Sequence, residues 1–381
     1  MSADNAVKAA VIDVELDKQE YRRLVNCTSF LMVLDGEVSV LNKARLLDFH
    51  SHGGDCLKHF EIASQMTADF FILLEHGNDT LCKVGDLIVA LSWCVDNDIS
   101  LISMSIGTTE YYDSEKFDDV ISRINEAGVC AIAGANNNRS LSYPACLREI
   151  LGVCIDYTYE TVRDYFAYID NPLDGVNIVL NPNICSDLLI DSNSMATAYF
   201  SGVIAKAIKN KETTPRSVRS WLVNNAERFS NTVLYEYTFS AIALEASDDV
   251  IVIGVEGLSS NAHVAEYCRE LKKIFRDEEY HCTIIFSCGE ILLTSNFSKY
   301  EFVQPMREMC SYGEYISLIT KLCKPNLMLT DLNENGCELD AVICLENNQT
   351  TYGKKLVVAI KDDFPGKVFK RIEKHFNPES R

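Results

Sequence analysis

The sequence has no apolar run long enough to cross a membrane. Nowhere in its 381 residues does an uninterrupted apolar stretch reach the roughly 20 residues that a spanning helix needs. The first eight residues also lack the apolar segment of a secretory signal peptide. We therefore expect a cytoplasmic protein without a membrane partner.

An excess of basic residues is also missing. The chain has 35 Lys and Arg against 55 Asp and Glu, and its formal net charge is −20. Because phosphate binding needs a basic surface, this balance argues against a nucleic-acid partner. The negative charge could steer basic peptide segments toward the protein, although solubility is the simpler explanation.

Paired cysteine motifs are absent as well. The 15 cysteines are odd in number and form no Cys-x-x-Cys pair, and many lie in apolar stretches, such as Cys94, Cys130 and Cys154. Free buried thiols in a reducing compartment explain this pattern best. A disulfide framework is the poorer alternative.

The most informative stretch that is present runs from Ser192 to Ala198. Small residues there lead into a predicted helix, Met195 to Ile208, with apolar residues at 195, 199, 200, 203, 204 and 208. At a helix N-terminus, Ser194 would have a free backbone N–H beside its hydroxyl, and the helix dipole would favour negative charge there. This is half of an acyl-transfer site, although a serine in such a place is commonly only a helix cap.

The other half lies upstream, in the order Asp13, His52, Ser194, which is the order of the subtilisin triad. From these residues, about the first 240 positions resemble a subtilisin-like serine peptidase (subtilase), of the divergent cytosolic type associated with bacterial peptide maturation. Five segments carry the resemblance in the family's order: Ala10–Asp13, Ser51–Gly53, Ile102–Gly107, Gly128–Asn137 with Tyr143–Ala145, and Asn193–Thr197 with Gly202.

The resemblance implies a role for each triad residue. Ser194 would be the nucleophile, His52 the general base, and Asp13 the carboxylate that holds the imidazole tautomer. The side-chain amide of Asn137 would complete the oxyanion hole with the Ser194 backbone N–H. Alternatives stay open, since His52 could be a surface histidine and the run Asn136 to Asn138 could form a turn.

The resemblance also implies a substrate-binding groove. Ser105, Ile106 and Gly107 would form the strand that pairs with an extended peptide, with Gly107 leaving room for the peptide backbone. Gly134, Ala135 and Asn136 would line the pocket for the residue before the cut. Gly77 would belong to a second substrate-contacting strand, where the acidic Glu75 and Asp79 could favour basic side chains.

Several flanking residues depart from the family pattern. These are Val14-Glu15 after Asp13, Gly54-Asp55-Cys56 after the histidine motif, Asn136, Ser192 and Ala198. Asp55 would add negative charge near His52 and raise the histidine pKa. The departures favour a selective peptidase and leave a catalytically inactive scaffold open. The N-terminal propeptide and the acidic calcium loops of secreted members are not seen, which fits a cytosolic protein. We expect no metal and no cofactor.

The predicted fold class is α/β, with a parallel sheet flanked by helices. Residues 1–244 would form the subtilisin-like domain and residues 247–381 a smaller Rossmann-like accessory domain. Buried strands are expected at Ala9–Ile12, Asp69–Leu74, Ile99–Met104 and Val129–Ala133, and helices at Asp86–Val95 and Arg216–Ala226. The second domain would hold strands at Val250–Val255, His281–Ser287, Asn326–Asp331, Ala341–Glu346 and Lys355–Ile360, with helices at His263–Arg276 and Tyr315–Cys323.

The loop Gly254 to Asn261 of the second domain lies where a phosphate-binding loop would occur. It has no Gly-Lys-Ser/Thr and no complete GxGxxG, so a lost nucleotide site is the better interpretation. Weak similarity to proteins that accompany subtilases in peptide maturation suggests that the domain binds a precursor peptide or a protein partner.

These features together predict a serine endopeptidase that cuts a specific peptide, the leader of a ribosomally synthesised modified peptide. Two alternatives remain. One is an inactive scaffold that binds the precursor or a partner peptidase, and the other is a peptidase of general protein turnover.

Overall fold

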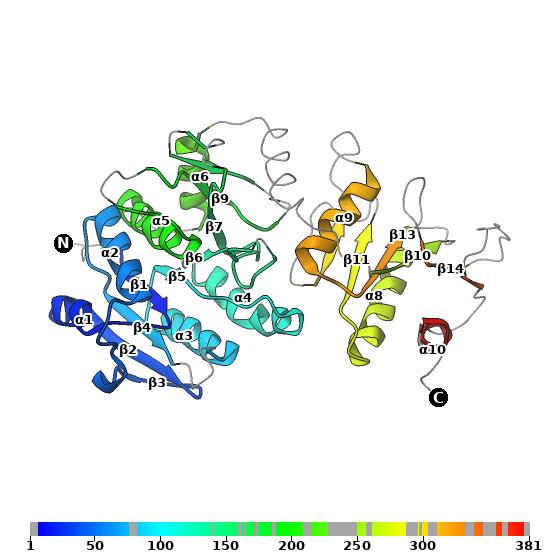
Figure 1. Cartoon of the computed structure of the whole chain (residues 1–381), viewed down its shortest axis with the longest axis horizontal. Helices are drawn as coiled ribbons and strands as arrows, with labels where there is room; N and C mark the ends of the chain where they lie inside the picture. The colour runs from blue at the N-terminus through cyan, green and yellow to red at the C-terminus, as the bar shows by residue number, and fades with distance from the viewer. Residues whose placement is uncertain are drawn as a thin grey trace. The chain divides into compact units, whose positions relative to one another are not determined.

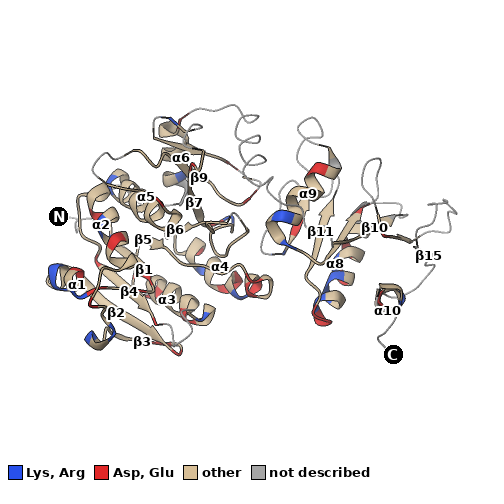
Figure 2. Cartoon of the chain, viewed as in Figure 1, with Lys and Arg blue, Asp and Glu red and all other residues tan. Residues whose placement is uncertain are grey.

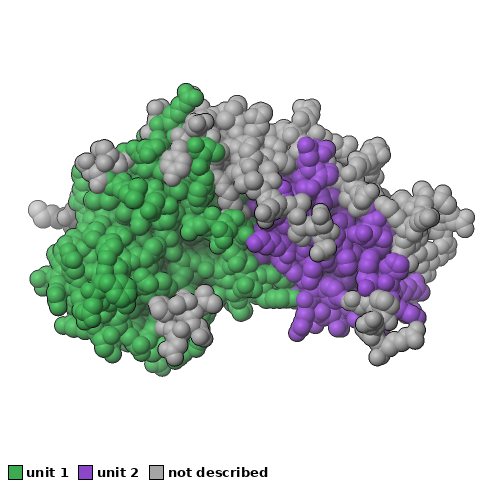
Figure 3. Space-filling view, viewed as in Figure 1, with its two compact units in different colours: residues 1–237 green, residues 238–381 purple. Residues whose placement is uncertain are grey.

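The protein was examined as a computed structural model that describes residues 7–75, 82–138, 140–158, 162–163, 165–170, 172, 174–184, 188–208, 215–227, 250–256, 261–286, 296, 299–303, 311–331, 339–345, 356–359 and 365–376. The chain divides into two compact units, Met1–Tyr237 and Thr238–Arg381 (Figures 1 and 3). The boundary predicted between residues 244 and 247 falls outside the described residues. None of the helices in the described ranges is long and apolar enough to span a bilayer.

Unit 1 contains a nine-stranded sheet in the order β3-β2-β4-β1-β5-β6-β7-β9-β8. Neighbouring strands are parallel except for the pairs β2–β3 and β8–β9. The strands are β1 (Ala9–Asp13), β2 (Ser29–Leu34), β3 (Glu37–Val40), β4 (Phe70–Leu74), β5 (Leu101–Met104), β6 (Cys130–Gly134), β7 (Leu151–Ile155), β8 (Phe166–Tyr168) and β9 (Ile178–Leu180).

The central strand β1 explains where the site forms. All five of its residues are buried, as expected for a parallel strand covered on both faces. It pairs with β4 on one side and β5 on the other, and β5 pairs with β6. Because parallel strands end at the same edge of a sheet, Asp13, Ser105 and Gly134 come to that edge together.

Helices and two short 3-10 segments surround this sheet (Figure 1). They are α1 (Lys18–Leu24), α2 (His52–Ser64), α3 (Val84–Asp96), α4 (Asp118–Glu126), α5 (Asn193–Ile208) and α6 (Pro215–Asn225), with the 3-10 segments η1 (Lys43–Arg45) and η2 (Tyr111–Phe117). Acidic and basic residues are interspersed on helices such as α1 and α4, and the central strands carry few charges (Figure 2).

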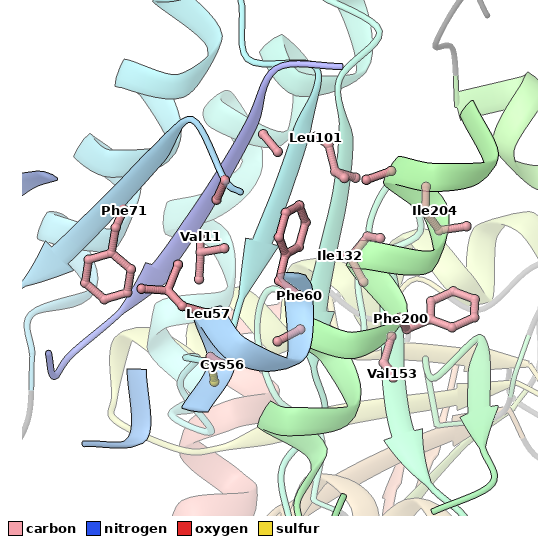
Figure 4. Packing of buried hydrophobic residues seen from close by; sticks show 14 of the residues in the cluster. Val11, Cys56, Leu57, Phe60, Phe71, Leu101, Ile132, Val153, Phe200 and Ile204 are labelled. Atoms are coloured by element: carbon pink, nitrogen blue, oxygen red, sulfur yellow. The ribbon is translucent and has the colours of Figure 1, made fainter. Parts of the chain in front are cut away.

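The helices α2 and α5, which carry the predicted base and nucleophile, pack against each other over the sheet. Phe60 and Leu57 of α2 and Phe200 and Ile204 of α5 are fully buried in one core cluster with strand residues such as Val11 (Figure 4). Gly202 of α5 allows the close approach, since a Cβ there would overlap the carbonyl oxygen of Phe60.

Unit 2 contains a six-stranded sheet, parallel throughout, in the order β12-β11-β13-β10-β14-β15. Its strands are β10 (Ile251–Glu256), β11 (Cys282–Phe286), β12 (Glu301–Val303), β13 (Leu327–Asp331), β14 (Ala341–Cys344) and β15 (Leu356–Ala359). Its helices are α8 (Asn261–Asp277), α9 (Tyr312–Cys323) and α10 (Pro365–Phe376).

The α/β fold class is thus confirmed. In the Rossmann order 3-2-1-4-5-6, the first and second strands in sequence pair directly with each other. In unit 2 the first two strands, β10 and β11, are instead separated by β13. The Rossmann-like detail therefore stays a prediction. Half of the predicted loop Gly254 to Asn261, residues 257–260, lies outside the described residues.

Candidate active site

Asp13 and His52 meet at the carboxyl edge of the sheet. The Asp13 side chain is fully buried, and its two oxygens lie 3.0 and 3.2 Å from His52 Nδ1. Asp13 Oδ1 also accepts a hydrogen bond from the Val14 N–H at 2.7 Å. His52 is the first residue of α2, whose cap Ser51 accepts from the Gly54 N–H and donates to Asp17 Oδ2 at 2.8 Å. The imidazole is therefore oriented by a rigid strand and a capped helix.

The surroundings of His52 favour its protonated form. The hydrogen bond with Asp13 is the main cause, and it raises the His52 pKa above its usual value although burial acts in the opposite direction. The negative charges of Glu15 and Asp55 add to this effect. The direction expected for Asp55 from the sequence is thus the one found, whereas the contribution of Glu15 was not anticipated.

Ser194 lies in the first turn of α5 and is half-buried. The capping hydrogen bond at this helix end comes from another residue, because Ser192 Oγ accepts from the Met195 N–H at 3.3 Å. Among the described residues, no hydrogen bond engages Ser194 Oγ. The helix-cap explanation weighed for Ser194 therefore applies to Ser192.

A chain of contacts connects Ser194 to His52. Ser105 Oγ donates to the Ser194 carbonyl at 3.3 Å and lies 3.3 Å from Cys56 Sγ. Cys56 Sγ is in turn 4.0 Å from His52 Nδ1. Within the described residues there is no direct hydrogen bond between Ser194 and His52, and such catalytic contacts are often long without substrate.

Cys56, noted in the sequence only as a departure from the family pattern, is a neighbour of the site. It follows His52 by four residues on α2, and this spacing places two side chains on one helix face. Burial raises its pKa well above the usual thiol value, and the charge of Asp13 adds to the shift. Cys56 is therefore a neutral thiol beneath the imidazole.

Asp13, His52 and Cys56 could in principle offer three ligand atoms to a metal ion, since these atoms lie within 4.8 Å of one another. His52 Nδ1 is engaged by Asp13, and the high pKa of the buried thiol opposes the thiolate form that metals bind. The donors fit proton transfer better than metal binding, so we assign no metal to this group.

Asn137 approaches the turn that carries Ser194. Its Oδ1 accepts from the Asn193 N–H at 3.4 Å and from the Tyr157 hydroxyl at 3.5 Å. The turn expected for an asparagine run is formed by its neighbours, because the Asn138 N–H donates to Asn136 Oδ1 at 2.8 Å. Asn137 is thus the asparagine of the three whose side chain contacts the nucleophile turn.

The segment Ser105 to Gly107 follows β5 at the same edge. Among the described residues, no backbone hydrogen bond engages Ile106 or Gly107, so this segment could pair with an extended peptide. The role expected for Gly107 toward the peptide stays a prediction, and the structure shows a second reason for glycine. A Cβ at Gly107 would lie 2.6 Å from the Tyr143 carbonyl oxygen, so the glycine makes room for the protein's own backbone.

The opposite predicted wall, Gly134 to Asn136, continues from β6. The Ala135 N–H donates to the Val153 carbonyl at 2.9 Å and the Asn136 N–H to Ser142 Oγ at 3.0 Å. These bonds hold the wall against its neighbours.

The second predicted substrate strand is described only at its start. Gly77 and Asp79 lie outside the described residues. Glu75 is paired with Arg45 at 2.6 Å, and its side chain is 8% exposed. Its charge is therefore already compensated, which weakens the expected preference for basic substrate residues.

Comparisons with known proteins point to proteases. Halolysin of Haloferax mediterranei is 28% identical over 158 residues, which are 40% of this chain and 30% of halolysin. The chain thus spans less than a third of that relative's length. No family model matches the chain.

Two solved structures match part of the chain at low sequence identity. A lanthipeptide protease is 13% identical with a TM-score of 0.43, over 59% of this chain and 81% of its own. The prenylagaramide maturation protease PagA is 16% identical with a TM-score of 0.40, over 60% of this chain and 86% of its own. The chain is similar to subtilisin-like serine proteases, as its motifs predicted.

Proposed function

We propose that the protein is a serine endopeptidase that acts through Ser194, His52 and Asp13. The main support is the pair of short contacts between the Asp13 carboxylate and His52 Nδ1. Ser194 lies near the same edge of the sheet, where its carbonyl accepts from Ser105. An imidazole that donates from Nδ1 to a carboxylate presents Nε2 as an acceptor. That nitrogen is the one that a serine nucleophile requires.

The proposed reaction is acyl transfer. Ser194 Oγ attacks the carbonyl carbon of the peptide bond while its proton passes to His52 Nε2. His52 then gives this proton to the departing amine, and water releases the acyl group from Ser194 in a second half-reaction. The Asn137 amide and the Ser194 N–H would stabilise the oxyanion. The peptide would pair with the segment Ser105 to Gly107.

We further propose that the substrate is one specific peptide, the leader of a ribosomally synthesised modified peptide, cut in the cytoplasm. The acidic neighbours Glu15 and Asp55 distinguish this histidine site from the family pattern. The second α/β unit would supply a surface for the precursor or for a protein partner. The alternative hypothesis is a catalytically inactive scaffold that binds the precursor peptide or a partner peptidase.

A fluorophosphonate probe tests the catalytic proposal, because it reacts with a serine only where base and oxyanion donors are assembled. Wild type, Ser194→Ala and the neighbouring control Ser192→Ala would be labelled, and the adduct mapped by mass spectrometry. The proposal expects an adduct on Ser194 in wild type and in Ser192→Ala, and none in Ser194→Ala. No adduct on folded wild type would contradict it and favour the scaffold.

The substrate proposal needs its own test. Unfolded casein and a set of leader-containing precursor peptides would be incubated with wild type and Ser194→Ala. Cleavage at a single site in a precursor, with casein left intact, would support a selective peptidase. Rapid degradation of casein would instead indicate general protein turnover.

A further inference from the structure

Asn193, the residue before Ser194, has a buried side chain whose oxygen and nitrogen both form hydrogen bonds. It is 1% exposed. Its Oδ1 accepts from the Ile155 N–H at 2.9 Å. Its Nδ2 donates to the Ala135 carbonyl at 2.9 Å and to the Asn136 carbonyl at 3.4 Å. These partners belong to the ends of β6 and β7, so one side chain connects both strands to the nucleophile turn.

The amide lies where the ladder between β6 and β7 ends. The last paired residues are Gly134 and Val153, followed by the bond from the Ala135 N–H to the Val153 carbonyl. Beyond that point the Asn193 side chain accepts a hydrogen bond from Ile155 at the end of β7 and donates one to Ala135, which follows β6. A primary amide offers the same acceptor and donor as a peptide group, so it extends the ladder between strands that no longer pair directly.

The backbone of Asn193 reaches the other parts of the proposed site. Its N–H donates to Asn137 Oδ1 at 3.4 Å, and its carbonyl accepts from Thr197 Oγ1 at 2.6 Å. The first bond holds the Asn137 side chain against the nucleophile turn. Asn193 therefore contacts the wall at Ala135 and Asn136, the oxyanion candidate Asn137, and the helix α5, of which it is the first residue.

We propose that Asn193 is a positioning residue, whose buried amide sets the separation between the nucleophile turn and the wall that runs from Ala135 to Asn137. This inference rests on the proposed function of Ser194 and Asn137. Asn193 touches no reacting atom and acts through the groups it holds. Its loss should therefore slow the chemical step more than it weakens binding.

Two variants of nearly equal shape provide the test. Asn193→Val removes every side-chain hydrogen bond, whereas Asn193→Thr keeps a hydroxyl that can still bond to one strand. Asn181→Ala is the matched control, because Asn181 is also a buried asparagine, with its Nδ2 bonded to the Arg163 carbonyl at 2.8 Å, and it bonds to none of the proposed catalytic residues.

Labelling by an alkyl fluorophosphonate gives separate values for the maximal inactivation rate and the half-saturating concentration. We expect Asn193→Val to lower the maximal rate about 100-fold, the loss typical of a displacement of about an ångström in a catalytic site. Asn193→Thr should recover at least part of this loss, and Asn181→Ala should leave the rate unchanged. A folded Asn193→Val that reacts at the wild-type maximal rate would overturn the inference.

Hydrogen exchange provides a readout that does not require Ser194 to be a nucleophile. The Ile155 amide should exchange faster in Asn193→Val and in Asn193→Thr than in wild type, and should be unaffected by Asn181→Ala. If wild type is not labelled at all, the proposed function fails and this measurement still decides the role of Asn193. Unchanged protection of Ile155 in both variants would contradict it.

Discussion

The Asp13 carboxylate and the His52 imidazole, 39 positions apart in sequence, meet through contacts of 3.0 and 3.2 Å. Neither partner can easily move away. Asp13 ends a fully buried strand that pairs on both sides, and His52 begins a helix capped by Ser51. Side chains held by such regular elements keep the geometry that proton transfer requires.

Asp13→Asn should abolish most of the reactivity of Ser194 while leaving the fold intact. The amide can donate to Nδ1 and so favour the tautomer with the proton on Nε2, which cannot accept from a serine. We expect the rate of fluorophosphonate labelling to fall about 10⁴-fold, as for triad carboxylates in other serine proteases.

The control for this variant is Asp69→Asn. Asp69 Oδ2 accepts from the Ala9 N–H at 2.8 Å, at the opposite end of β1, so its replacement should leave labelling nearly unchanged. Labelling of Asp13→Asn at the wild-type rate would show that Asp13 does not orient the base.

Glu15→Gln should extend reactivity to lower pH. His52 must be neutral to accept a proton, and its pKa is raised by Asp13 first and then by Glu15 and Asp55. As the pH is lowered, labelling should therefore be lost at a higher pH than an ordinary histidine would give. Removal of the Glu15 charge should move this acid limit to lower pH. The pH profile of the labelling rate measures the shift.

Asp48→Asn is the control for the pH profile, because the Asp48 side chain is 83% exposed and paired with Lys18. Its profile should coincide with that of wild type. An acid limit that stays in place in Glu15→Gln would mean that Glu15 does not act on His52.

The contact between Asp13 and His52 should stabilise the fold most at acidic pH, where labelling is lost. A raised His52 pKa means that the folded protein favours the protonated imidazole, so this stabilising contribution is complete below the unfolded pKa and is lost as the pH rises through the folded pKa. Urea unfolding should show that Asp13→Asn costs more stability at acidic than at alkaline pH, apart from effects common to both. Equal losses at the two pH values would contradict this linkage.

Much of the fold could be predicted because the central parallel strands are mostly apolar. The strand predicted at Ala9–Ile12 is found at Ala9–Asp13, and the helix predicted at Asp86–Val95 is found at Val84–Asp96. The hairpin of β2 and β3 was not predicted. β3 is mostly exposed, and β2 is fixed by its pairing with β4, residues far away in sequence.

The candidate site shows a similar limit. The motifs identified Asp13, His52, Ser194 and Asn137 because each follows a recognisable strand or begins a helix. The network around Asn193 gave no such signal, since its amide partners lie between 38 and 58 positions away. Only the folded chain brings them together.

Cys56 should resist alkylation in the folded protein. Its thiol is fully buried and its pKa is well above the usual value, mainly because of burial, so little reactive thiolate exists at neutral pH. Iodoacetamide should modify the exposed Cys27 rapidly and Cys56 only after unfolding, as peptide mass spectrometry would show. Equal modification rates for the two thiols in native protein would contradict the buried position.

Gly202→Ala should destabilise unit 1, although alanine is the better helix former. A Cβ at Gly202 would overlap the Phe60 carbonyl of α2, and such overpacking typically costs about 1–3 kcal/mol. Because α2 carries His52 and α5 carries Ser194, any separation of the two helices should also slow fluorophosphonate labelling. Urea unfolding and the labelling rate measure the two effects.

Gly85→Ala is the matched control, since Gly85 lies in α3 and a Cβ there would meet nothing within 4 Å. Helix propensity alone then predicts a gain of up to about 1 kcal/mol, with labelling unchanged. If both variants gained stability equally, helix propensity would dominate at both positions, and the close contact of α2 and α5 at Gly202 would be contradicted.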